Sequence, residues 1–361
     1  MFKRSLAAML TASTLAVCGA AAETPWRDVL DTPAMPSALA SRALVNGIAR
    51  SGNRLVAVGQ RGHVLLSDDE GRGWQQARVP VSSDLVAVSF PDANAGFAVG
   101  HDRVVLHSGD RGATWTRVLD GRSVGAAMVE YYRGAGAATG DAARIADALK
   151  AAEAFATQGA ENPFLDVGFE NASTGYLVGA FGLILGTTDG GKTWQPLLHA
   201  TDNPKALHLY AVRAVGGEVY IAGEQGLLLK LDRASGRFRA LDLPYKGTLF
   251  GVTGSERAVV VHGLRGTVLR SVDRGQSWQT VATGVAVGLT ASAVDRAGRI
   301  VIVSQAGHVL LSDDDGASFA LAKVDKPVPA AAVAFTGAST LVVGGPRGVS
   351  TLTLPNLPKQ P

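Results

Sequence analysis

The sequence predicts an all-β protein, a seven-bladed β-propeller built from four-stranded blades. Three observations lead to this fold class. A short motif, Ser/Thr-x-Asp-x-Gly-x-x-Trp/Phe, recurs along the chain, its copies are regularly spaced, and the stretches between them are β-rich runs separated by glycine-containing turns. A repeat of about 40 residues accommodates four short strands, which is one propeller blade.

The repeated motif is the Asp box, and it marks the outer part of each predicted blade. Good copies are Ser67–Trp74, Ser108–Trp115, Thr187–Trp194, Ser271–Trp278 and Ser312–Phe319, with a degenerate copy at Asp232–Phe238. The aromatic residues that end the motif are regularly spaced. Trp74 and Trp115 are 41 residues apart, and the steps from Trp194 through Phe238 and Trp278 to Phe319 are 44, 40 and 41 residues. These copies predict six complete blades.

We interpret the motif as a device of the fold. The Asp side chain accepts hydrogen bonds from turn amides, the Gly adopts a backbone conformation that other residues resist, and the aromatic ring packs between sheets. The predicted structural residues are Asp69, Gly71, Trp74, Asp110, Gly112, Trp115, Asp189, Gly191, Trp194, Asp273, Gly275, Trp278, Asp314, Gly316 and Phe319.

A seventh blade is visible at the C-terminal end but lacks one strand. Ala330–Phe335, Thr340–Val343 and Val349–Leu354 supply three strands. Near the other end, Thr24–Leu30 matches the outer-strand phrase Thr114–Leu119. We therefore expect the N-terminal segment to complete the last blade, which would join the two ends of the chain and protect the sheet edge.

A helical insertion is predicted between blades 2 and 3. Trp115 and Trp194 are 79 residues apart, about 38 more than one repeat requires. We place the insertion at residues 119–162, on the same face as the connections between blades, with Asp141 capping its second helix. The apolar residues at helical spacing are Val124, Met128, Tyr131 or Tyr132, Ile145, Leu149, Ala152 and Phe155.

The N-terminal residues 1–22 are predicted to be a signal peptide, which leaves residues 23–361 as a single propeller domain. Lys3 and Arg4 precede an apolar run over residues 6–17, and three alanines at 20–22 form a cleavage site. We expect export to the periplasm. A lipid anchor on Cys18 is the less favoured alternative, because Val17 stands where a lipoprotein signal prefers a small residue. Cys18 is the single cysteine, so the mature chain would have no disulfide and no thiol chemistry.

Charge and residue spacing exclude several classes of partner and cofactor. The net charge is +3, and without Lys3 and Arg4 the 32 basic residues nearly balance 31 acidic ones. No basic run with interleaved aromatic residues indicates nucleic acid, and no later stretch reaches the roughly 18 apolar residues of a membrane helix. The acidic clusters at 68–70 and 313–315 lack the spacing of a calcium loop. No two histidines have the close spacing of metal ligands, such as His-x-His or His-Glu-x-x-His. We predict no metal and no cofactor.

The turns between the second and third strands of the blades are predicted to share one face, opposite the Asp boxes. Arginine recurs in four of these seven turns, at Arg61, Arg103, Arg265 and Arg347. Three of them belong to adjacent blades 7, 1 and 2, and Arg265 lies across the channel. Guanidinium groups offer a planar fork of donors to carboxylates, so we predict a partner-binding site. The alternatives are pairing with neighbours such as Asp102 or Glu224, or simple copying by repetition.

With these features the chain resembles the Asp-box propellers related to the photosystem II stability and assembly factors of cyanobacteria and chloroplasts. The resemblance rests on the seven-fold pattern, on Asn162–Val167, on Val178–Trp194 and on arginines at one face. It implies a non-catalytic lumenal or periplasmic protein that holds membrane-protein subunits during assembly and carries an arginine patch. Relatives outside phototrophs resemble accessory proteins of envelope complexes, often linked with large export pumps. The helical insertion departs from the family pattern, and the resemblance does not identify the protein that this chain binds.

We therefore predict a monomeric, non-catalytic periplasmic scaffold that docks the exported loop or tail of a membrane protein through its arginine face. A glycoside hydrolase is one alternative. Its sialidase form usually shows an Arg-Ile-Pro phrase, which is absent, but a carboxylate pair at the separation other glycosidases need remains open among 31 acidic residues. A carbohydrate-binding propeller is the other alternative, with Phe181 and Tyr245 as the aromatic residues that could stack on a sugar.

Overall fold

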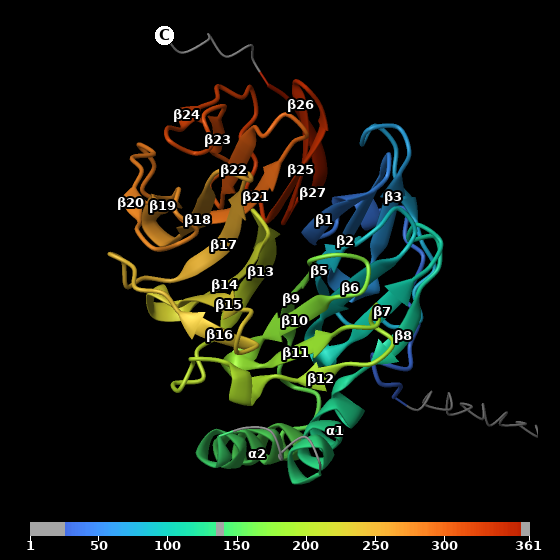
Figure 1. The fold of residues 1–361 in the computed structure, drawn as a ribbon. Helices are drawn as coiled ribbons and strands as arrows, with labels where there is room; N and C mark the ends of the chain where they lie inside the picture. The colour runs from blue at the N-terminus through green and yellow to red at the C-terminus, as the bar shows by residue number, and fades with distance from the viewer. Residues whose placement is uncertain (1–25, 135–140, 355–361) are drawn as a thin grey trace, which may run out of the picture.

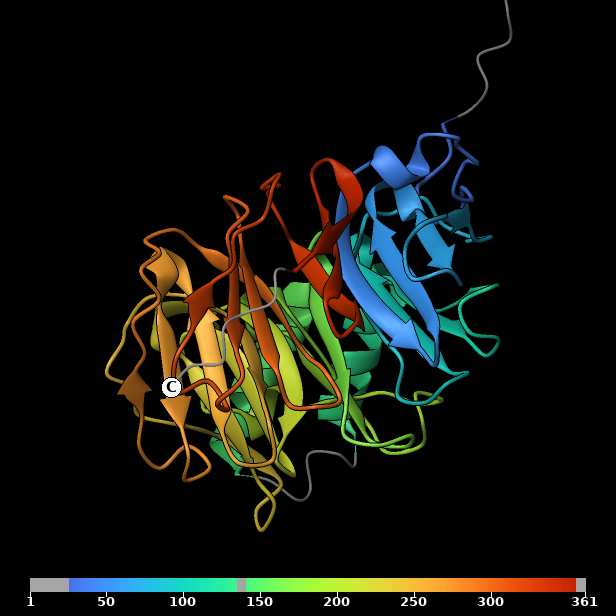
Figure 2. The same ribbon diagram turned by 90° about the horizontal axis from the view of Figure 1, so that it is seen from above.

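The computed structural model describes residues 26–134 and 141–354, which form seven antiparallel sheets arranged around a ring (Figure 1). Six sheets have four strands and the last has three. The first strand of each sheet lies near the centre and contacts the first strand of the next sheet, and the seventh sheet returns to the first. The red seventh sheet stands beside the blue first sheet in both views (Figures 1 and 2). The predicted seven-bladed propeller is confirmed.

The strands follow one another outward from the centre in every blade. Blades 1 and 2 contain β1 (Val45–Ser51), β2 (Arg54–Gly59), β3 (Val64–Ser67), β4 (Gln75–Gln76), β5 (Leu85–Ser89), β6 (Gly96–Gly100), β7 (Val105–Ser108) and β8 (Thr116–Leu119). Blades 3 and 4 contain β9 (Phe164–Phe169), β10 (Gly175–Gly179), β11 (Ile184–Thr187), β12 (Gln195–Pro196), β13 (Leu209–Val215), β14 (Glu218–Gly223), β15 (Leu228–Asp232) and β16 (Arg237–Ala240). Blades 5 to 7 contain β17 (Leu249–Gly254), β18 (Val259–Gly263), β19 (Val268–Ser271), β20 (Gln279–Thr280), β21 (Leu289–Val294), β22 (Ile300–Ser304), β23 (Val309–Ser312), β24 (Ala320–Leu321), β25 (Ala332–Gly337), β26 (Thr340–Gly345) and β27 (Gly348–Thr353).

The core lies between neighbouring blades and is mostly aliphatic. Leu55–Val58 in β2 and Val259–Val261 in β18 are buried along their whole length. A strand covered on both faces by adjacent sheets has no solvent side, so its residues are apolar in an unbroken run. The continuous apolar runs in the sequence thus correspond to second strands.

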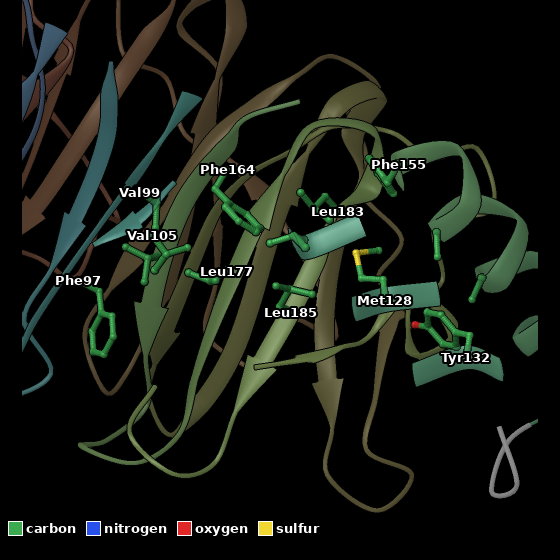
Figure 3. Packing of buried hydrophobic residues seen from close by; sticks show 14 of the residues in the cluster. Phe97, Val99, Val105, Met128, Tyr132, Phe155, Phe164, Leu177, Leu183 and Leu185 are labelled. Atoms are coloured by element: carbon green, nitrogen blue, oxygen red, sulfur yellow. The ribbon is translucent and has the colours of Figure 1, made fainter. Parts of the chain in front are cut away.

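The predicted insertion forms two helices, α1 (Gly121–Arg133) and α2 (Ala142–Thr157), outside the ring (Figure 1). Asp120 and Asp141 cap them by accepting backbone N–H groups of Arg122 and Ala143. Met128 and Tyr132 of α1 and Phe155 of α2 pack with blade-3 residues of β11 and its neighbours (Figure 3). The helical stripe therefore covers the edge of blades 2 and 3, and Tyr132 rather than Tyr131 is its fully buried tyrosine.

The predicted closing strand is wrong for those of its residues that the structure describes. Residues 26–30 form no strand, and the last sheet has the three strands β25, β26 and β27. The N–H of Ser82 instead donates to the carbonyl of Val29 (2.8 Å), and Leu30 is buried in the core between blades 1 and 2. An apolar site for Leu30 thus holds this segment on the opposite side of blade 1 from blade 7.

The ring closes through contacts between blades 7 and 1. Arg50 Nη1 donates to the carbonyl of Phe335 (2.7 Å), and Thr351 Oγ1 donates to the carbonyl of Gly71 (3.2 Å). Gly344 sits so close to Val45 that an added Cβ would lie 2.5 Å from its side chain. Packing and these hydrogen bonds therefore close the ring, which was the role expected of the N-terminal strand.

The predicted signal peptide, including Cys18, lies outside the described residues. Within 26–134 and 141–354, neither helix has the length and apolarity needed to cross a bilayer.

Candidate partner-binding face

Blades 1 to 5 carry the same short turn between their second and third strands. The turns are η2 (Gln60–Gly62), η3 (His101–Arg103), η5 (Ala180–Gly182), η7 (Glu224–Gly226) and η8 (Leu264–Gly266). The first N–H of each turn donates to the carbonyl of the residue just before the first strand of its own blade, as Gln60 does to Leu44 (3.1 Å). These turns therefore lie on the same face as the connections between blades. We call this the turn face, and the opposite side, which carries the Asp boxes, the Asp-box face.

The middle residue of each turn is held in the left-handed region of backbone conformation. Its φ is 56° at Arg61, 54° at Phe181 and 57° at Arg265. In four of the five blades a glycine follows, and a Cβ on Gly266 would lie 1.6 Å from the carbonyl oxygen of Val285 in the next connection. The backbone of the turn is thus fixed by close packing, whereas the middle side chain projects from it.

Three of the four predicted arginines are exposed on the turn face. Arg61, Arg265 and Arg347 are solvent-accessible, and none forms an ion pair within the residues that the structure places. Glu224, a candidate partner in the sequence, instead accepts the backbone N–H of His208 through Oε2 (2.8 Å). The three guanidinium groups are therefore available to an external carboxylate.

Arg103, the fourth predicted arginine, is not on this surface. Its side chain is 0% exposed, and Nη1 donates to the carbonyl of Phe155 in α2 (3.1 Å). The guanidinium carbon lies 5.0 Å from the centre of the Phe155 ring, while Nε and Nη2 have no hydrogen-bond partner in the described part of the chain. Burial lowers the pKa of Arg103. The structure thus separates Arg103 from the other three.

The separation has a local cause in the alignment of the turns. Asp102, with a φ of 57°, takes the place that Arg61 occupies in blade 1, and Arg103 takes the place of Gly62. In the other blades a side chain there would strike the next connection. Blade 2 is followed by the helices instead, which leave room for an arginine beneath α2.

At its centre the turn face opens into a channel mouth, a cavity of about 590 Å³. In six blades the first strand has a register irregularity at its second residue, and that residue lines the mouth. The six residues are Asn46, Val86, Leu165, Tyr210, Phe250 and Thr290. All six are half-buried. Bulges re-aim side chains, and here they direct one residue of each of these six blades toward the opening.

An ion pair lies deeper in the channel. Asp166 of β9 is buried and accepts hydrogen bonds from Arg213 and from the backbone N–H of Val212 (2.8 Å). Burial raises the pKa of Asp166, and the charge of Arg213 opposes that shift. The Arg213 side chain is 47% exposed and lines cavities at both ends of the channel, so the guanidinium is the member of this ion pair that faces the channel.

On the Asp-box face, the motif side chains are bonded within their own turns. Asp189 Oδ1 accepts the Thr187 hydroxyl (2.8 Å) and the Thr193 N–H (2.9 Å), and Oδ2 accepts the Thr193 hydroxyl. These bonds lower the pKa of Asp189 to about 2. Equivalent bonds are made at Asp69, Asp110, Asp273 and Asp314. A carboxylate occupied in this way is a fold element, and our structural interpretation of the Asp boxes stands on these bonds.

Neither acidic cluster of the sequence gathers into a metal site. In the ranges that the structure describes, no three His, Cys, Asp or Glu side chains converge as metal ligands would. Asp68 is bonded to Arg54 (2.7 Å) and Asp315 to Arg257 (2.8 Å), so their partners are arginines.

The residues of the channel mouth were not predicted from the sequence. A signal for them exists at the start of the first strands, where Leu209-Tyr210-Ala211 and Leu249-Phe250-Gly251 share the order aliphatic, aromatic, small. Blade patterns place such a residue near the centre, but the irregularity that turns its side chain into the opening depends on strand pairing.

A closed ring of Asp-box blades, with free arginines around a channel mouth on one face, defines a β-propeller of the Asp-box class. The chain belongs to the family described as photosynthesis system II assembly factor YCF48, whose profile matches residues 51–129 and 153–319. The gap between the matched stretches, residues 130–152, falls within the helical insertion, and the residues before 51 and after 319 also lie outside the match.

Two curated relatives match part of the chain. The photosystem II assembly lipoprotein Ycf48 of Synechococcus sp. (strain CC9902) is 30% identical over 162 residues, 43% of this chain and 47% of the relative. The chloroplastic photosystem II stability/assembly factor HCF136 of Oryza sativa subsp. japonica is 28% identical over 182 residues, 43% of this chain and 44% of the relative. The chain thus spans a little under half the length of the curated relatives it matches.

The fold itself is similar to that of a solved structure of YCF48 bound to a D1 peptide. The two superpose with a TM-score of 0.62 at 16% identity, over 88% of this chain and 95% of the other. At this identity the likeness concerns the fold.

Proposed function

We propose that this chain is a non-catalytic, exported assembly factor whose turn face binds a loop or tail of a membrane protein. The observation that carries the proposal is the set of Arg61, Arg265 and Arg347, exposed and without ion pairs on the face that surrounds the channel mouth. Family membership supports an assembly role, and a related fold has been solved with a D1 peptide bound. Export to the periplasm is supported by the basic start and apolar run of the N-terminal residues.

The chemistry of the face favours an acidic segment as the partner. Each guanidinium can donate two parallel hydrogen bonds to a carboxylate, and three of them spread over blades 7, 1 and 5 can read several acids along one segment. We place the partner among membrane proteins of the cell envelope outside photosynthesis, with an export pump as one candidate complex. Because the surface charges are screened by salt, this binding will weaken as ionic strength rises.

In-cell crosslinking of the tagged protein, followed by mass spectrometry, tests the proposal. The test variant changes Arg61, Arg265 and Arg347 together to glutamate. A matched control changes Arg72, Arg111 and Arg274 on the Asp-box face to glutamate, which alters the net charge equally. We expect one membrane protein to be captured by the native chain and by the control, and to be lost from the turn-face variant.

Equal capture by all three forms would show that these arginines do not bind the partner. Hydrolysis of chromogenic glycosides by the purified protein, abolished by changing one turn-face carboxylate, would replace the scaffold function with the glycosidase alternative.

A further inference from the structure

A row of aromatic rings crosses the turn face from blade 3 to blade 5. The distances between ring centres are 4.7 Å from Phe181 in η5 to His208, 6.2 Å from His208 to Tyr210, and 5.4 Å from Tyr210 to Phe250. Tyr210 and Phe250 line the channel mouth. His208 is held in place because its Nδ1 accepts the backbone N–H of Phe181 (2.7 Å). The row therefore runs continuously from the outer turn to the central opening.

Phe181 at the outer end of this row is costly for the fold. Its φ is 54°, a left-handed conformation that disfavours bulky residues by about 1 kcal/mol or more. Its side chain is 54% exposed, so its burial offsets only part of that cost. In blade 4 the equivalent position holds Gln225, with a φ of 53°. A strained and exposed phenylalanine at a position open to polar residues points to a use outside folding.

Blade 5, which contributes Phe250, also carries an exposed leucine beside an arginine in its turn. Leu264, the first residue of η8, is 37% exposed, and its N–H donates to the carbonyl of Thr248 (3.0 Å), two residues before Phe250. Arg265 is the next residue and is free of ion pairs among the described residues. We call Phe181, Tyr210, Phe250 and Leu264 the apolar strip.

We propose that the apolar strip receives the hydrophobic side chains of the bound segment, and that Arg265 pairs with an acid next to them. This inference rests on the function proposed above and names its ligand class more closely: an extended peptide that combines an aromatic or large aliphatic residue with an acidic one. The turns of blades 7 and 1 carry Arg347 and Arg61, and no row of contacting aromatic rings lies beside them among the described residues. Blades 3 to 5 therefore supply the selectivity that a basic patch by itself lacks.

The ring arrangement favours a peptide over a sugar. Successive rings are nearly perpendicular, with interplanar angles of 81°, 88° and 77° along the row. A pyranose stacks on a flat ring face. A row of rings packed edge to face has gaps between the rings, and these gaps accept the branched and aromatic side chains of a peptide.

Selection from a phage library of random linear peptides on the purified full-length protein provides the test. Selected peptides are then synthesised with a fluorescent label and titrated by anisotropy at low and high salt. The test variant is Phe181→Gln, which installs the residue of the equivalent blade-4 turn. Leu321→Gln is the matched control, because Leu321 of β24 is 55% exposed in a different blade.

We expect selected peptides to combine Phe, Tyr, Trp, Leu or Ile with Asp or Glu. Phe181→Gln should bind them about tenfold more weakly at both salt concentrations, since the lost contact is apolar. Arg265→Gln should weaken binding mainly at low salt, and Leu321→Gln should have no effect. The thermal midpoint of Phe181→Gln should equal or exceed that of the native chain, which separates lost binding from lost folding.

Three results would overturn the inference. Acidic peptides selected without apolar preference, and bound equally by Phe181→Gln, would leave the arginine function intact and remove the strip. Failure of the native chain to select any peptide above the triple arginine variant would defeat the proposed function as well. Binding to a glycan array that disappears in Phe181→Gln would assign the strip to a sugar.

Discussion

The two faces of the propeller are built on the same backbone turn but use side chains differently. On both faces a left-handed residue is followed by a left-handed glycine, as at Arg111-Gly112 in an Asp box and Arg61-Gly62 on the turn face. The Asp-box turn is held by its own side chains, with the Ser108 hydroxyl accepting the Gly112 N–H (2.9 Å). The turn-face turn is held by a connection between blades. The Gln60 N–H donates to the carbonyl of Leu44 (3.1 Å), and the Asp84 carboxylate of the next connection accepts the Arg61 N–H (2.7 Å).

This difference explains why a repeat can be conspicuous and yet say little about function. Where side chains of the turn itself hold it, the same residue types recur in the five good copies, and the sequence motif is the result. On the turn face the side chain of the middle residue takes no part in holding the turn, so that residue is free to vary, and the chain has Arg61, Phe181, Gln225 and Arg265 at that place. The variable turns therefore carry the recognition, and the invariant ones carry the fold.

The largest effect is expected where close packing against the next connection fixes the turn. Gly266→Ala puts a Cβ 1.6 Å from the Val285 carbonyl at a φ of 72° and should cost about 3–5 kcal/mol of unfolding free energy. Gly298→Ala is the control, because its φ is 87° with open space around it, and it should cost only about 1 kcal/mol. Urea unfolding measures both. Equal costs would mean that the connection moves aside and does not clamp the turn.

A smaller effect should separate the side chains of the two faces. Asp110→Ala removes the acceptor of the Thr114 N–H (2.9 Å) and of the Ser108 hydroxyl (2.8 Å), and should destabilise the protein by about 1–2 kcal/mol. Arg61→Ala, which loses no side-chain bond, should stay within about 0.5 kcal/mol of the native chain. If the arginine change proved the more damaging in chemical unfolding, our division between fold and recognition would be reversed.

The same division decided how much could be predicted from the sequence. The Asp boxes and their spacing gave the blades, because local side-chain bonds recur in each copy and leave a trace in the residues. Arg103 was grouped with Arg61 because the sequence shows both in short turns, whereas a count from Gly100 and Gly59 places Arg103 in the glycine position. That count was available from the sequence, but the room beneath α2 was not.

The closing strand and the channel mouth depended on tertiary structure. Residues 26–30 have the composition of an outer strand, yet their position follows from a buried site for Leu30 between blades 1 and 2. Tyr210 and Phe250 lie in ordinary strand patterns, and only strand pairing reveals the irregularity that points them into the opening. The β-propensity of a segment does not specify which blade it packs against.

Acid should weaken the Asp-box face selectively. Hydroxyl and amide donors hold the pKa values of Asp189 and Asp273 at about 2, below the value of about 3.9 for an unfolded Asp. Because the folded pKa is the lower one, this stabilisation is complete above about pH 4 and is lost as the pH falls toward 2. Urea midpoints measured across that window should fall less steeply for the Asp189→Asn/Asp273→Asn variant, which has less to lose. Parallel curves for the two proteins would show that these carboxylates do not set the acid limb.

A small effect is also expected at Arg103, where blade 2 departs from the turn shared by its neighbours. A buried guanidinium with one hydrogen bond pays a desolvation cost that the contact with Phe155 offsets only in part. Arg103→Met keeps the volume and removes the charge, so the unfolding free energy should remain within about 1 kcal/mol of the native value or rise. Arg103→Gly, which restores the residue of blade 1, should instead lower it through the cavity left beneath α2. A marked loss in the Met variant would mean that the charge itself is needed, with Glu161 as the acid acting on it. Partner capture unchanged in Arg103→Met would place the working arginines on the open part of the turn face.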